Sequence, residues 1–169
     1  MRARPLAAIT LLALALAAAC APLGADEPGP CAGQGTRIRV LTAAHRLYLC
    51  HGDAVEGEVA VALGRGGTGK RVEGDLRTPL GDYPLGAPRA SDDFHVFIPV
   101  GYPTEEQRRA GYTGGDIGVH GPARRLRRLG AAAVAVDWTR GCIAVPSDDD
   151  IDAIAAWVAR RAPADVLLE

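Results

Sequence analysis

The sequence predicts a mainly β, α+β domain with one substantial helix near the C-terminus. Short runs in the first third of the chain alternate apolar and polar residues, as half-buried strands do. One later segment, after Ser147, carries the longer helical period, and a last apolar run follows it. The chain has 169 residues, of which 48% are hydrophobic, and this suits one domain with a packed core.

We expect strands, in order, over residues 37–41, 46–50, 58–63, 94–100, 116–120, 141–145 and 165–168. Turns at residues 43–45 and 51–53 separate the first three strands. The short strands over 116–120 and 141–145 each end or begin beside a glycine, so they present side chains at a loop.

Two helices are predicted from their caps. Thr104 begins a short one over residues 104–110, with glutamates in its first turn. Ser147 begins the main helix, which runs to about Arg160. Its acidic residues 148–150 suit the positive end of the helix dipole. Its apolar face comprises Ile151, Ile154, Ala155 and Val158.

The N-terminus has the pattern of an export leader. Arg2 and Arg4 precede an apolar segment, residues 6–19, and small residues precede Cys20. The segment is too short for a comfortable transmembrane helix, which needs about 20 residues. Cys20 resembles a bacterial lipoprotein cleavage site, so lipidation and ordinary secretion both stay open. We predict an exported protein of the periplasm or cell envelope.

These features divide the chain into a leader over residues 1–20, a linker over 21–35 rich in Pro, Gly and Ala, and one folded domain over 36–169. Export places the cysteines in an oxidising compartment, where Cys31 and Cys50 can pair across a hairpin edge. A bridge of this loop length stabilises a fold by about 3 kcal/mol on the chain-entropy model. Two unrelated buried thiols are the alternative.

Cys142 is then the free thiol, and its setting is chemically suggestive. It follows Gly141 at the start of an apolar run, where its sulfur is presented beside backbone N–H groups. His120 lies at a second strand-to-turn junction, before Gly121. A thiol and an imidazole so placed are the parts of a cysteine nucleophile with its general base. The alternative is a buried cysteine that only packs.

Composition excludes several other mechanisms. Neither of the two serines, Ser91 and Ser147, has a lysine three places on, as a serine D,D-transpeptidase requires. The chain has no asparagine, which excludes a Cys-His-Asn triad. No His-x-x-x-His or Cys-x-x-Cys pattern occurs, so we expect no metal and no cofactor. A net charge of −1 gives no case for nucleic acid.

Three stretches, residues 69–83, 114–121 and 137–145, resemble in order the motifs of the L,D-transpeptidase (YkuD-like) catalytic domain family. The resemblance covers residues 36–169 and implies a mixed-sheet β-sandwich or barrel-like catalytic fold. Two positions depart from many members. Arg140 stands where histidine is common, and Ala144 stands where a polar residue is common.

The resemblance implies an enzyme that acts on peptidoglycan stem peptides. Cys142 would attack the L,D-peptide bond at diaminopimelate and form a thioester, and an amine of a neighbouring stem would resolve it into a cross-link. His120 as an imidazolium would lower the thiol pKa and then move protons. The alternatives are an L,D-carboxypeptidase or endopeptidase, in which water resolves the thioester, and a non-catalytic wall-binding lipoprotein.

The remaining site residues follow from these roles. The N–H groups of Gly141 and Cys142 are the expected oxyanion hole. The carbonyl of Gly121 is the family-like partner that would orient His120, and Asp116 is the alternative.

We also expect substrate contacts from Arg140, Tyr83 and Thr139. Arg140 either holds a stem carboxylate or points to solvent. The expected partners are therefore stem peptides and, if Cys20 is lipidated, a membrane. The basic run over residues 124–128 reads as a solvated face, with contact to anionic wall or lipid as the alternative.

Overall fold

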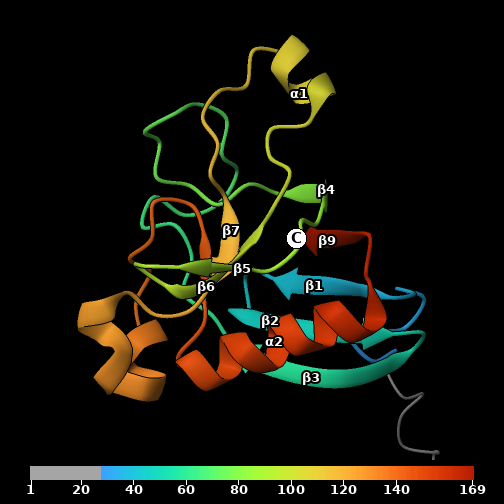
Figure 1. Cartoon of the computed structure of the whole chain (residues 1–169). Helices are drawn as coiled ribbons and strands as arrows, with labels where there is room; N and C mark the ends of the chain where they lie inside the picture. Colours follow the sequence, from blue (N-terminus) through green and yellow to red (C-terminus); the bar gives the residue numbers. More distant parts are fainter. Residues whose placement is uncertain (1–27) are drawn as a thin grey trace, which may run out of the picture.

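The computed structural model describes residues 28–169, so the predicted leader and Cys20 lie outside the described residues. Two β-sheets form the body of the domain, and the long helix α2 lies across them (Figure 1). The strands are β1 (Arg37–Leu41), β2 (Arg46–His51), β3 (Ala54–Ala60), β4 (Gly81–Pro84), β5 (Arg89–Ser91), β6 (His95–Pro99), β7 (Gly118–His120), β8 (Ile143–Ala144) and β9 (Asp165–Leu168). The helices are α1 (Glu105–Arg109), the 3₁₀ segment η1 (Arg124–Val134) and α2 (Asp148–Arg161).

The first sheet has the strand order β3-β2-β1-β9-β4. β1 pairs antiparallel with β2 and parallel with β9, which makes the sheet mixed. The third strand was predicted over residues 58–63, but β3 begins earlier, at Ala54, and ends at Ala60. Gly52, with φ of 62°, makes a tight turn that pairs His51 with Ala54, so β3 begins there. The buried residues 61–63 instead cross to the second sheet, where Ala62 bridges Ala144.

The second sheet, with the order β5-β6-β7-β8, positions the two predicted catalytic residues. β7 and β8 are parallel neighbours, and His120 at the end of β7 pairs with Ala144 in β8. Cys142 immediately precedes β8, so this register places the thiol and the imidazole on adjacent strands. Hydrogen bonding along the sheet thus brings together residues that are 22 apart in the numbering.

The main helix is confirmed with its cap. The Ser147 side chain accepts a hydrogen bond from the Asp150 N–H, and α2 runs from Asp148 to Arg161. It packs against both sheets, through β2 and β6, as Figure 1 shows. Its buried side chains are Ile151, Ile154, Trp157 and Val158. The capping box at Thr104 is also present, where α1 begins. No helix within residues 28–169 is long and apolar enough to cross a membrane.

Cys31 and Cys50 are joined by a disulfide, and both are fully buried. The bridge fastens the turn before β1 to the end of β2. The Gly33 N–H adds a 2.8 Å hydrogen bond to the Asp53 carboxylate, which holds the same turn.

We predict that reducing this bridge, or replacing both cysteines with alanine, lowers the free energy of unfolding by about 3 kcal/mol, because the unfolded chain regains the entropy of an open loop. Urea unfolding of oxidised and reduced protein measures the difference. Counting thiols under denaturing conditions, on protein that lacks Cys20, is the control. One free thiol is expected, and three would contradict the bridge.

Candidate active site

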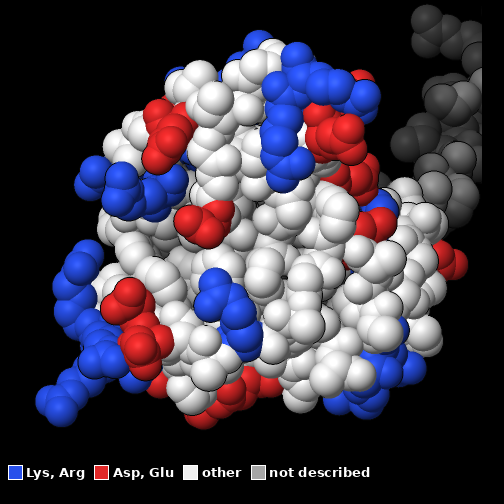
Figure 2. Space-filling view, turned by 45° about the horizontal axis from the view of Figure 1, so that its top comes forward, with Lys and Arg blue, Asp and Glu red and all other residues white. Residues whose placement is uncertain are grey.

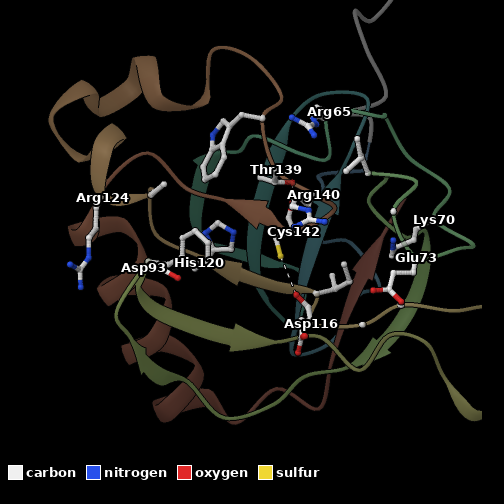
Figure 3. A pocket seen from close by; sticks show the side chains of 18 of the residues that line it. Arg65, Lys70, Glu73, Asp93, Asp116, His120, Arg124, Thr139, Arg140 and Cys142 are labelled. Carbon is white, nitrogen blue, oxygen red and sulfur yellow. Dashed lines mark hydrogen bonds between the residues drawn. The ribbon is translucent and has the colours of Figure 1, made fainter.

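A pocket of about 730 Å³ lies between the loop after β3, the chain that leads into β7 and the loop before β8 (Figure 3). Cys142 and His120 both line it, which brings the predicted nucleophile and base to one cavity. Arg140 lines the same pocket and is exposed. Within residues 28–169 no group of three or more His, Cys, Asp or Glu side chains is placed to hold a metal ion.

The Cys142 thiol is protonated in its resting state. Its sulfur donates a hydrogen bond to the Asp116 carbonyl at 3.3 Å (Figure 3). Burial raises the pKa of the thiol to about 11; a hydrogen bond from the Gly118 backbone and the charge of Lys70 oppose this, and the charge of Asp116 adds to it. Withdrawal from water disfavours the thiolate more than these neighbours favour it.

His120 is neutral and held in one tautomer. Only 1% of the residue is exposed, and burial lowers its pKa to about 4, against a smaller opposite effect of its hydrogen bond to Gly121. Nδ1 lies 2.6 Å from the Gly121 carbonyl oxygen, which can only accept, so Nδ1 carries the proton. Nε2 is therefore the basic nitrogen. The carbonyl of Gly121 holds the ring, as expected from the sequence.

These two pKa values contradict the expected thiolate–imidazolium resting pair. Near neutral pH a thiol with a pKa of about 11 keeps its proton, and an imidazole with a pKa of about 4 lacks one. Both shifts have the same cause, since burial penalises the charged form of each group. His120 must then take the proton from Cys142 during the attack and not beforehand.

Aromatic side chains enclose the His120 ring, and sequence reasoning missed the nearest one. Phe94 stacks on the imidazole with ring centroids 3.9 Å apart and an interplanar angle of 24°. Trp138 meets the ring edge-on at 5.9 Å, and Phe97 is parallel to it at 6.1 Å. The aromatic rings exclude water from His120, and they explain its lowered pKa. The sequence gives no sign of this role for Phe94, which lies in the turn before β6.

Thr139 shapes the cysteine loop from inside. Its hydroxyl donates to the Cys142 carbonyl at 2.8 Å and accepts from the Gly141 N–H at 3.1 Å, and the residue is only 3% exposed. The hydroxyl makes both of these hydrogen bonds within residues 139–142. Thr139 therefore positions the loop that carries Cys142, in place of the substrate contact expected from the sequence. Because the Gly141 N–H donates to Thr139, it is not free to stabilise an oxyanion. The Cys142 N–H keeps that role as a proposal.

Gly141 is required for steric reasons. Its φ is +131°, a conformation that L side chains rarely adopt, and a Cβ there would lie 2.6 Å from the Arg77 carbonyl oxygen.

We predict that Gly141→Ala destabilises the fold by about 1–3 kcal/mol and displaces Cys142, with at least about a 100-fold loss of turnover. Thermal unfolding and steady-state assays measure the two effects. Gly115→Ala is the matched control, because Gly115 lines the same pocket and an added Cβ meets nothing within 4 Å. Equal losses in both variants would contradict this account of Gly141.

Tyr83 does not line the pocket, and its expected substrate contact is wrong. In β4 it pairs with Val166 of β9, and this register turns the side chain into the core, where it is 1% exposed. Its hydroxyl donates to the Leu80 carbonyl at 2.7 Å and accepts from the Gln107 side chain at 3.0 Å. The Tyr83 hydroxyl therefore links Leu80, just before β4, to Gln107 in α1.

Lys70 supports the pocket wall and was also missed, although it is the only lysine of the chain. Its ammonium lies 2.8 Å from Asp75, and its side chain is 4% exposed. Burial alone would raise the pKa of the Asp75 carboxyl, but Lys70 and backbone N–H groups hold it well below its usual range. Asp75 accepts hydrogen bonds from the N–H groups of Arg71, Val72 and Arg77. The carbonyl of Arg77 in turn lies against Gly141, so this ion pair supports the cysteine loop.

Comparison with known proteins places this chain in a family. Residues 35–166 match the L,D-transpeptidase catalytic domain, YkuD. No curated protein matches the chain. Among solved structures, the helical cell shape determining protein Pgp2 from Campylobacter jejuni is similar, at 27% identity and a TM-score of 0.65, over 78% of this chain and 46% of that one.

Two further structures show the same fold at lower identity. Bd1075 from Bdellovibrio bacteriovorus aligns at 20% identity and a TM-score of 0.54, over 79% of this chain and 47% of that one. An L,D-transpeptidase from Mycobacterium smegmatis aligns at 14% identity and a TM-score of 0.50, over 78% and 57%. The chain spans about half the length of these proteins. With the family domain matched over most of its length, the chain belongs to the L,D-transpeptidase (YkuD) catalytic domain family.

Proposed function

We propose that this protein is a peptidoglycan L,D-transpeptidase that works through an acyl-enzyme on Cys142. The observation that carries the proposal is the pairing of a thiol with an imidazole of defined tautomer in one pocket. Because Nδ1 of His120 is held by the Gly121 carbonyl, Nε2 is the nitrogen free to exchange a proton. The site thus has a nucleophile, a base and an orienting group for the base.

Acylation follows from these parts. As the Cys142 sulfur attacks the carbonyl carbon of an L,D-peptide bond, its proton passes to Nε2 of His120. The carbonyl oxygen becomes an oxyanion, which the Cys142 N–H stabilises. The C–N bond then breaks, His120 returns the proton to the leaving amine, and a thioester remains. An imidazolium whose pKa is lowered to about 4 is a strong acid, so it gives up this proton readily.

In the second half of the reaction an acceptor amine attacks the thioester. The amine transfers its proton to Nε2, the C–S bond breaks, and the proton returns to the sulfur. A new amide bond joins two stems, and the neutral pair is restored. We propose that this reaction takes place outside the cytoplasm, after export through the leader over residues 1–20, with residues 36–169 as the catalytic domain. Cys20 would anchor the protein to a membrane if it is lipidated, and ordinary secretion is the alternative.

A second candidate uses the same acyl-enzyme but lets water replace the amine, which gives an L,D-carboxypeptidase. Residues that line the pocket, such as Arg140, are exposed to solvent, and the similar protein Pgp2 is described as a determinant of helical cell shape. Trimming stem peptides removes donors of cross-links, so hydrolysis and cross-linking would both alter the wall.

Incubation of the purified protein with disaccharide tetrapeptides tests the proposal, with mass analysis of the products. Cross-linked dimers together with released D-amino acid support transpeptidation. Shortened monomers alone support the carboxypeptidase. If no stem peptide changes under conditions where the protein is folded, the proposed function is overturned.

A further inference from the structure

We propose that Arg65 and Arg140 together form a carboxylate-binding site beside Cys142, which recognises a carboxylate of the substrate next to the scissile bond. The sequence left the role of Arg140 open and gave no role to Arg65. The inference deepens the proposed function and rests on it where the substrate is concerned.

The backbone holds the two arginines together. Gly64 and Thr139 form a parallel β-bridge, the Arg65 N–H donates to the Thr139 carbonyl at 3.1 Å, and the Thr139 N–H donates to the Leu63 carbonyl at 3.1 Å. Arg65 and Arg140 follow the two bridged residues, so they occupy neighbouring places on paired segments. Both line the pocket, and Figure 3 shows Arg140 next to Cys142 with Arg65 beyond it.

Neither guanidinium is matched by a carboxylate among the described residues, in contrast to many other arginines of the domain. Ion pairs join Arg37 to Asp165, Arg39 to Glu169, Arg46 to Glu58, Arg127 to Asp148 and Arg161 to Glu56. In the pocket itself, the charge of Lys70 is already paired with Asp75, and Arg124 donates to the Asp92 carbonyl. Arg65 and Arg140 thus keep their donors for a ligand.

Charges of both signs line the pocket, since Glu73, Asp93 and Asp116 contribute to it as well as the arginines. On the face in Figure 2, basic and acidic side chains are interspersed with one another and separated by uncharged residues. A dispersed pattern of this kind gives no broad attraction for a polyanion. A guanidinium instead binds a carboxylate through two parallel hydrogen bonds, which fix direction as well as position. Two arginines beside the sulfur would therefore hold a peptide carboxylate so that the neighbouring carbonyl faces Cys142.

A pair of alkylating agents tests the site without any need for turnover. Iodoacetate and iodoacetamide both transfer their methylene carbon to the Cys142 sulfur and release iodide, and the thiol proton goes to solvent. They differ in that only iodoacetate carries a carboxylate. We therefore measure, by intact-protein mass, the ratio of the iodoacetate rate to the iodoacetamide rate at pH 9. Any change in the thiol pKa affects both rates and cancels in the ratio.

We expect Arg65→Gln and Arg140→Gln each to lower this ratio about threefold to fivefold, as for the loss of one exposed charge contact, and the double variant to lower it about tenfold. High salt should lower the ratio of the wild type in the same direction. The matched control is Arg125→Gln, another arginine of the pocket, which lies in η1 and not on the bridged segments. Circular dichroism shows that each variant is folded.

Two outcomes overturn the site. One is an unchanged rate ratio in the double variant. The other is an equal fall of the ratio in Arg125→Gln, which would indicate that any positive charge in the pocket attracts iodoacetate. A fall in Arg140→Gln without one in Arg65→Gln overturns the pair.

Modified stem peptides then identify the carboxylate that is bound. One tetrapeptide has its C-terminal carboxylate amidated, and a second has the side-chain carboxylate of its third residue amidated. For the peptide whose bound carboxylate is amidated, we expect the wild type to show a KM about tenfold higher than for the unmodified peptide. Arg65→Gln and Arg140→Gln should not change the KM of this amidated peptide. If neither amide does so, the substrate role is overturned. If no stem is processed at all, the proposed function fails, whereas the alkylation ratio still reports on the arginine pair.

Discussion

Replacing Cys142 with alanine is expected to abolish turnover of stem peptides, with a loss of at least about 10⁴-fold, because no other group in the pocket can form the thioester. The fold should persist. The sulfur makes only weak hydrogen bonds, to the Asp116 carbonyl and from the Gly118 backbone, and it lies at the pocket surface and not in the core. We expect the free energy of unfolding to change by no more than about 1 kcal/mol. Product analysis by mass and thermal unfolding measure the two quantities.

Cys142→Ser is the informative companion, since it keeps the size and polarity of the side chain. It should be nearly inactive, because a hydroxyl holds its proton far more tightly than a thiol. His120, whose pKa is lowered to about 4, is too weak a base to remove that proton. Substantial turnover by the alanine variant, once purified free of wild-type enzyme, would remove Cys142 from the mechanism.

The sequence predicts an element well where the signal is local. α2 has a serine cap, an acidic first turn and a helical apolar period within one segment, and the structure has the helix where these signals put it. The boundary of β3 depends instead on the tight turn at Gly52 and on the need of residues 61–63 to reach the second sheet. η1 was not predicted, because Ala123 gives it no side-chain cap and Gly130, with φ of 51°, interrupts it.

The same distinction applies to the site. Cys142 and His120 could be proposed because each lies at a strand end beside a glycine, and the pairing of β7 with β8 then brings them together. The direction of the Tyr83 side chain could not be predicted, because in the short strand β4 it depends on the register with β9. Lys70 was missed because no sequence pattern pairs it with Asp75, although both lie in one loop. Arg65 was missed because the segment beside it, at Thr139, lies in another loop.

The charge state of Cys142 and His120 could not be predicted from the sequence, for a physical reason. Thiol and imidazole exchange a proton according to how well each charge is solvated, and this depends on what covers them. The stacking of Phe94 on His120 and the edge contact of Trp138 come from separate loops. Only their convergence removes water from the imidazole and reverses the expected resting state.

The neutral pair predicts a steep pH dependence for alkylation of Cys142 by iodoacetamide, which reacts with the thiolate. With a thiol pKa of about 11, the thiolate fraction at pH 7 is about 10⁻⁴ and rises about tenfold for each pH unit up to about pH 10. We therefore expect the second-order rate constant to increase about 1,000-fold between pH 7 and pH 10. Stopped reactions analysed by intact-protein mass give this rate constant at each pH.

A resting ion pair predicts the opposite shape, because an imidazolium beside the sulfur would keep it ionised at low pH. The rate would then be high and nearly constant from about pH 6 to pH 8, as for cysteines whose pKa is lowered by a charged neighbour. His120→Gln distinguishes the two cases further. For a neutral pair it should leave the alkylation profile almost unchanged while it abolishes turnover, since His120 acts only when the sulfur attacks. A fast, pH-independent reaction in the wild type that is lost in His120→Gln would restore the ion pair and contradict the neutral one.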